Sequence, residues 1–200
     1  MCIRDSFKSF SDGSLGSRSA KLYTDYADDP GNTGILVISP EDLAKRMYKA
    51  YRHGLQPATH CIGDKALEVT LDAVEYCLEQ GLKDGMTPEE QAKRLPFRII
   101  HAQMATPELI ERMKKLPIVL DIQPTFLMTD LHWIEERVGK ERAVLSYPWK
   151  TYLDAGLIMA GGSDAPVESF NPWIGIYATV TRQDMDGYPV GGYHPNEKVS

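Results

Sequence analysis

The stretch Leu55-Gln56-Pro57-Ala58-Thr59-His60-Cys61-Ile62-Gly63-Asp64 contains a short strand pattern, a histidine at its end and the start of a helix. After Gly63, apolar residues recur at the three- and four-residue spacing of a helix until Gly81. Those residues are Leu67, Leu71, Val74 and Leu78. The same order of strand and helix recurs along the chain, which predicts an α/β protein with parallel strands.

Five strands and seven helices are expected in total. The strands end near Lys8 and cover residues 55–60, 97–101, 118–122 and 157–161. The helices cover residues 39–54, 63–81, 106–116, 131–138, 141–155 and 173–181, with a short one starting at the capping box of residue 87. A complete (β/α)8 barrel takes about 250 residues. This chain therefore fits part of a barrel, or an open doubly wound sheet without the glycine-rich dinucleotide turn.

Composition excludes several classes of function. The 200 residues include 22 basic and 28 acidic side chains, giving a net charge of -6 and no basic block for nucleic acid. No apolar run approaches the roughly 20 residues that span a bilayer, and the segment Met1–Ser6 lacks the core of a signal peptide. Three unpatterned cysteines (Cys2, Cys61 and Cys77) favour a reducing compartment, so cytoplasmic localisation is expected.

Side chains capable of chemistry follow the ends of the predicted strands. These are His60, His101, Gln123 and Asp164, and Lys8 precedes the loop 12–16. The carboxyl ends of parallel strands meet at one edge, so two imidazoles and a carboxylate from three strands can converge there. They are the ligand types of a catalytic zinc. On spacing alone, a metal site and a set of hydrogen-bonded structural residues stay equally open.

Other conspicuous residues have a structural interpretation. The turn 161–166 can be a tight turn with an Asx hydrogen bond. Cys61 points away from the strand-end site by alternation and is expected to be a small buried hydrophobe. The remaining histidines are expected at the surface and the tryptophans in packing roles. They are His53, His132 and His194, and Trp133, Trp149 and Trp173.

Six short stretches carry a family resemblance. They are Lys8–Arg18, His60–Asp64, His101–Gln103, Gln123–Pro124, Tyr147–Trp149 and Gly162–Val167. In this order and spacing, the sequence resembles the amidohydrolase superfamily, specifically the amidohydrolase 3 branch of YtcJ-like and N-substituted formamide deformylase-like proteins. The resemblance covers nearly the whole chain.

The resemblance implies a metal-dependent-hydrolase (β/α)8 barrel that binds one or two divalent metals, most often zinc. His60, His101 and Asp164 would be ligands from the fifth, sixth and eighth strands. Lys8 would be a ligand from the fourth strand in carboxylated form, since an unmodified ammonium cannot bind a metal. Residues 1–200 would form one partial barrel domain of about strands 4 to 8, truncated at both ends and without a second domain.

The sequence departs from the family pattern in three places. The first-strand His-x-His pair is absent from the 200 residues and would lie upstream of Lys8. Met1–Ser6 does not resemble the apolar strand expected before Lys8, and the family continues beyond Ser200. Ile100 stands before His101 where the family often has Glu, which would alter support of that histidine.

The expected function of the intact protein is hydrolysis of non-peptide carbon–nitrogen bonds, of amide or formamide type, by a metal-activated water. Asp164 would act as general acid and base, and Gln123 and Asp12 would bind the small-molecule substrate. The 200 residues alone are expected to be inactive. No nucleic-acid or membrane partner is expected, and homo-oligomerisation stays open.

Two rival functions are open from the sequence. The first is a catalytically silent truncated relative that keeps the barrel fragment as a scaffold or regulatory element, with two sheet edges open to pairing. The second is an open-sheet hydrolase with a serine nucleophile. No Gly-x-Ser-x-Gly elbow occurs in the sequence, which argues against the serine hydrolase.

Overall fold

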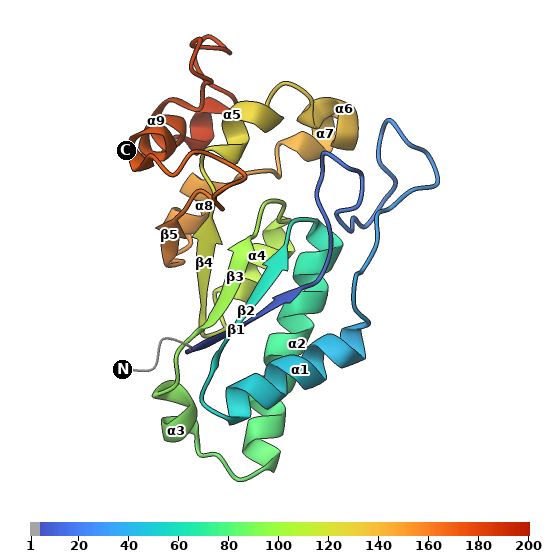
Figure 1. Cartoon of the computed structure of the whole chain (residues 1–200), viewed down its shortest axis with the longest axis vertical. Coiled ribbons are helices and arrows are strands. Elements are labelled where there is room, and N and C mark those ends of the chain that lie inside the picture. Colours follow the sequence, from blue (N-terminus) through green and yellow to red (C-terminus); the bar gives the residue numbers. More distant parts are fainter. Residues whose placement is uncertain (1–4) are drawn as a thin grey trace.

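A five-stranded parallel sheet is the centre of the computed structural model, which describes residues 5–200 (Figure 1). Met1–Arg4, with Cys2, lie outside the described residues. The strands are β1 (Ser6–Phe10), β2 (Gln56–Cys61), β3 (Phe97–His101), β4 (Ile118–Ile122) and β5 (Met159–Gly161). They are paired in the order β1-β2-β3-β4-β5. A doubly wound sheet reverses its strand order at a switch point, whereas this order never reverses, as in one arc of a barrel. The predicted fold class is confirmed.

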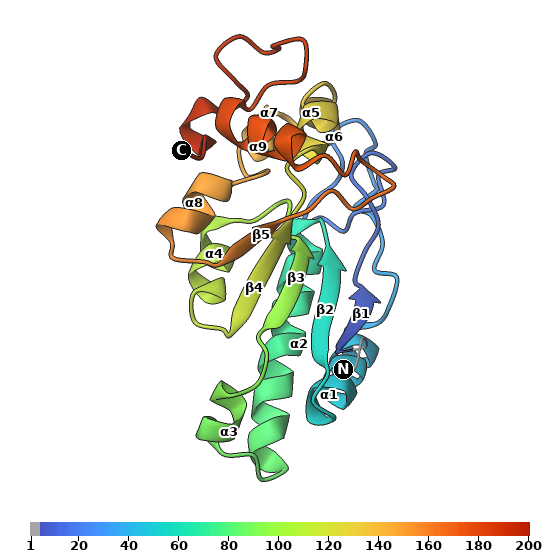
Figure 2. The same ribbon diagram turned by 60° about the vertical axis from the view of Figure 1, so that its left-hand side comes forward.

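Most helices lie on one face of the sheet or beyond the carboxyl ends of its strands (Figure 2). The helices are α1 (Pro40–Arg52), α2 (Asp64–Lys83), α3 (Pro88–Ala92), α4 (Pro107–Met113), α5 (Phe126–Asp130), α6 (Ile134–Val138), α7 (Lys140–Ala143), α8 (Trp149–Asp154) and α9 (Pro172–Thr181), followed by a 3-10 turn at Pro195–Glu197. Figure 2 shows α1, α2 and α4 behind the strands, and α5, α6, α7 and α9 gathered above their tips. The front face carries no helix from residues 5–200.

Local sequence determines where the helices start. The Ser39 hydroxyl accepts a hydrogen bond from the Asp42 amide, and Pro40 occupies the first position of α1. The Thr87 and Glu90 side chains form the predicted capping box of α3. Both predicted starts are confirmed.

The two faces of the sheet differ in chemistry. Phe97, Ile99 and Leu120 are fully buried toward the helices and join the main hydrophobic core. On the opposite face, Arg98 of β3 pairs with Asp121 of β4, with 2.6 Å between Nη2 and Oδ2. Alternation along the strands therefore gives an apolar face toward the helices and a polar face on the side that the figure leaves open.

The region after β4 differs most from the sequence-based expectation. The helix predicted over 141–155 is two short helices, α7 and α8, because residues 144–148 turn away from helical geometry. Tyr147 has a left-handed φ of 52°, and Pro148 precedes α8. The predicted helix 131–138 begins only at Ile134, and α5 was not predicted. The strand predicted over 157–161 starts at Met159.

Several placements of single residues can be compared with their predictions. Trp149 is buried as expected, but Trp173 is 74% exposed at the start of α9, so its packing role was wrong. Cys61 is buried as predicted, His132 is exposed, and His194 is half-buried. Among residues 5–200, no helix combines the length and hydrophobicity needed to cross a lipid bilayer.

Candidate metal centre

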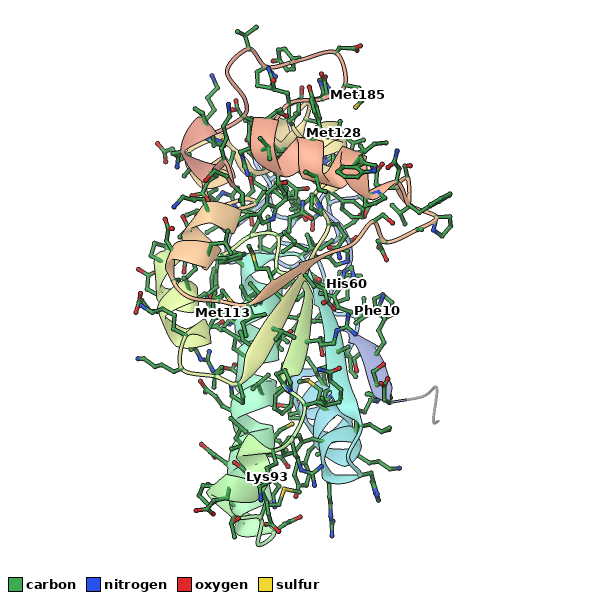
Figure 3. All side chains as sticks on the ribbon, turned by 90° about the vertical axis from the view of Figure 1, so that its left-hand side faces the viewer. Phe10, His60, Lys93, Met113, Met128 and Met185 are labelled. Atoms are coloured by element: carbon green, nitrogen blue, oxygen red, sulfur yellow. The ribbon has the colours of Figure 1, made fainter. Side chains whose placement is uncertain are left out.

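Two histidines meet at the carboxyl edge of the sheet. His60 lies in β2 and His101 ends β3, and their ring centroids are 4.5 Å apart with a near-perpendicular ring angle of 76°. The Phe10 ring at the end of β1 lies beside His60, at 5.1 Å between centroids, and Figure 3 labels this pair. Parallel strands place these ends at one edge, as the sequence predicted.

Asp164 approaches the same point from the loop after β5. Its Oδ2 lies 4.0 Å from His101 Nε2, and its side chain is 35% exposed. Asp164, His101 and Ala102 all have left-handed φ angles, of 53°, 74° and 43°. Such backbone costs on the order of 1–3 kcal/mol per residue and clusters at functional sites.

His101 is buried, and its ring nitrogens make no hydrogen bond of good geometry, although the Gln123 side chain lies close to the ring. Its side chain is 2% exposed, and neither Nδ1 nor Nε2 has a partner among the described residues. Burial, with the nearby charges of His60 and Lys8, lowers the His101 pKa to about 3, so the ring is neutral at pH 7. A neutral imidazole with buried, unpaired nitrogens is a costly arrangement in an apo protein and is the form that binds a metal.

His60 is held in one tautomer by a backbone carbonyl. Its Nε2 lies 3.0 Å from the Gly13 carbonyl oxygen, which can only accept, so Nε2 is the protonated nitrogen. Burial lowers the His60 pKa, and the Lys8 charge adds to this. The Nδ1 lone pair is therefore the one available to a cation, with the carbonyl orienting the ring.

Lys8 lies on the same side of the sheet, in the middle of β1 and not at its end as predicted. Its Nζ lies 4.9 Å above the Phe10 ring centroid, and its charge reaches both histidines. The four predicted ligands are therefore neighbours. Among residues 5–200, however, no group of three or more His, Cys, Asp or Glu side chains is arranged so that it could hold a metal ion, and the carboxylation of Lys8 stays a prediction.

The two predicted substrate-binding residues differ in their surroundings. Gln123 is buried beside the site, where its Nε2 donates to the Asp121 carbonyl at 2.9 Å and its Oε1 is unpartnered. Asp12 instead accepts from three backbone amides, those of Lys21, Ile62 and Gly63, at 2.9 to 3.0 Å. Burial raises the Asp12 pKa to about 7. Asp12 thus braces two loops, and its substrate role stays a prediction.

One residue near the site was missed from the sequence. Asp130, at the end of α5, is a buried carboxylate whose Oδ2 accepts from Gln103 and from Tyr147. Burial raises its pKa to about 6. Gln103 and Tyr147 lie within stretches that carry the family resemblance, but Asp130 itself stands in none of them.

The comparison with protein families shows which family the chain belongs to. The model described as "Amidohydrolase family" matches residues 2–200. The chain belongs to the amidohydrolase family. This amidohydrolase chain is 39% identical over 191 residues to the "Putative amidohydrolase YtcJ" of Bacillus subtilis (strain 168), covering 95% of the chain and 34% of that relative. It is 29% identical over 171 residues to the N-substituted formamide deformylase of Arthrobacter pascens, covering 84% and 29%.

The solved structures agree with this membership. The amidohydrolase chain superposes on an uncharacterized metal-dependent hydrolase from Pyrococcus furiosus with a TM-score of 0.79 at 34% identity. The match covers 96% of this chain and 36% of that one. The chain therefore spans about a third of the length of the relatives it matches.

Proposed function

We propose that this chain provides His60, His101 and Asp164 to the metal centre of a hydrolase that cleaves non-peptide carbon–nitrogen bonds. The observation that carries the proposal is His101, a buried imidazole with two unpaired nitrogens beside a second histidine and a carboxylate. The names of the relatives support the bond type, since one is called an amidohydrolase and another a formamide deformylase.

The proposed donors are of the chemical types that bind a divalent cation, and zinc before others. Nitrogen from His60 and His101 and oxygen from Asp164 are zinc ligands, and both imidazoles are held neutral by burial. Lys8 would join them only after carboxylation. When bound, the cation supplies Lewis acidity toward water and toward a substrate carbonyl.

The protein groups supply proton transfer and orientation. Asp164 is partly open to solvent, so it can accept a proton from the attacking water and return it to the departing nitrogen. The unpartnered Oε1 of Gln123 can accept a hydrogen bond from the substrate. The substrate is proposed to be a small amide or formamide. Cytoplasmic localisation is proposed only from composition.

A silent scaffold is the second candidate. It is favoured because, in the described part of the chain, no group of three or more His, Cys, Asp or Glu side chains is arranged to hold a metal ion.

Zinc titration of the metal-free chain separates the two candidates. We expect calorimetry to detect a zinc site that His101→Ala weakens at least tenfold, since it removes one of the ligands. His53→Ala is the matched control, because His53 is an exposed histidine after α1. Absence of specific zinc binding to the unmutated chain, or equal affinity in both variants, would reject the metal-centre proposal.

A further inference from the structure

The segment that carries His101 is held by a ring of buried hydrogen bonds. Oδ2 of Asp130 accepts from Gln103 Nε2 at 2.9 Å and from the Tyr147 hydroxyl. The Tyr147 amide in turn donates to the Gln103 carbonyl at 2.7 Å. Gln103 and Tyr147 are therefore joined through their backbones and, through one Asp130 carboxylate oxygen, through their side chains. Gln103 lies two residues after His101.

The outer end of this ring is fixed by a buried cation. Arg182, which is 0% exposed, donates from Nη1 to the Tyr147 carbonyl at 3.0 Å. Its guanidinium also lies 5.1 Å from the Trp149 ring centroid, a cation–π contact. Tyr147 is therefore held at its amide, its carbonyl and its hydroxyl, although its φ of 52° is unfavourable for a tyrosine.

Next to Gln103, the backbone of His101 and Ala102 adopts unfavourable left-handed φ angles. His101 and Ala102 have φ angles of 74° and 43°, which persist only where surrounding contacts over-determine them. The Ala102 amide donates to the Cys61 carbonyl at 3.1 Å, and its carbonyl accepts from Tyr152 at 2.7 Å. Asp130 supplies the acceptor that links the Gln103 and Tyr147 side chains beside this turn.

We propose that Asp130 is a positioning residue that fixes the backbone turn at residues 101–103, and thereby aims the His101 imidazole at the metal position. The inference rests on the proposed function, since it takes His101 as a ligand. Its structural part, a local restraint of the turn, can be tested without metal.

Hydrogen exchange measures that restraint. In Asp130→Ala, the amides of Ala102, Met104 and Tyr147 should lose protection on the order of tenfold more than amides of α2, because the buried donors of Gln103 and Tyr147 lose their acceptor. Asp130→Asn should restore protection, since its carbonyl oxygen can replace Oδ2. A general loss of stability would instead lower protection evenly.

A second variant keeps the test decisive if Asp130→Ala does not fold. Tyr147→Phe removes one donor from the ring and should loosen the same three amides. Its matched control is Tyr26→Phe, because Tyr26 is equally buried and donates to the Ala20 carbonyl at 2.8 Å, away from β3. Equal effects of the two substitutions on residues 101–104 would overturn the inference.

Zinc affinity tests the consequence for the site. Where the unmutated chain binds zinc, Asp130→Ala should weaken binding by about 10–100-fold and Asp130→Asn much less. Unchanged affinity in Asp130→Ala would overturn the positioning role. If the unmutated chain binds no zinc, the proposed function fails, and the exchange pattern alone decides whether Asp130 restrains the turn.

Discussion

A single methyl group at Gly63 should strain the backbone beside the candidate site. A Cβ at residue 63 would lie 2.0 Å from the carbonyl oxygen of Lys21 and 2.9 Å from its amide nitrogen. Ordinary contact begins at 3.4 Å, so the Lys21 backbone must retreat by about 1.4 Å, the difference between 3.4 and 2.0 Å. No flexible side chain can absorb this shift.

That shift would break two hydrogen bonds of Lys21. Its amide donates to Asp12 Oδ2 at 2.9 Å, and its carbonyl accepts from the Ala66 amide at 3.2 Å. Overpacking costs about 1–3 kcal/mol, and each lost bond about 0.5–1.5 kcal/mol. Gly63→Ala should therefore lower the free energy of unfolding by about 2–6 kcal/mol.

Urea denaturation followed by circular dichroism gives this free energy. Gly175→Ala is the control, since its Cβ would lie 3.8 Å from Pro124 inside α9, where alanine is favoured over glycine by about 0.5–1 kcal/mol. A Gly63→Ala variant within about 0.5 kcal/mol of the unmutated chain would refute the close approach of the two backbones.

Two further predictions concern buried carboxylates. Asp12→Ala should leave the backbone donors of Lys21, Ile62 and Gly63 unpaired, so limited trypsinolysis should cut after Lys21 at least several times faster; an unchanged rate would remove its bracing role. Asp130 has a folded pKa raised from 3.8 to about 6, so the folded state binds more protons between these values. Stability contributed by this group is therefore lost as pH rises from about 4 to 6, by up to about 3 kcal/mol. Urea denaturation should show this slope in the unmutated chain but not in Asp130→Asn, and equal slopes would contradict it.

Features set by neighbouring residues could be predicted from sequence. The start of α1 follows from Ser39, whose hydroxyl caps the nearby Asp42 amide, and from Pro40 in the first helical position. The meeting of His60 and His101 follows from the shared edge of parallel strands. Neither prediction needs side-chain contacts between distant residues, only local capping and the general geometry of parallel strands.

Features set by distant residues could not be predicted. The break between α7 and α8 depends on Tyr147, which is held by Asp130 and by Arg182, 17 and 35 residues away. Asp130 stands in the mostly apolar stretch 126–134, where nothing marks it as a hydrogen-bond acceptor, and its partner Gln103 is 27 residues upstream. The left-handed backbone of His101 likewise leaves no mark in the sequence.

The helix-free face of the sheet has a consequence for the lifetime of any complex with a cation. His60 and His101 reach the candidate centre from strands β2 and β3, and Asp164 reaches it from the loop after β5. A cation held at this edge would stay open to water on the helix-free face, so we expect it to dissociate quickly. A chelator should then remove it without unfolding the chain.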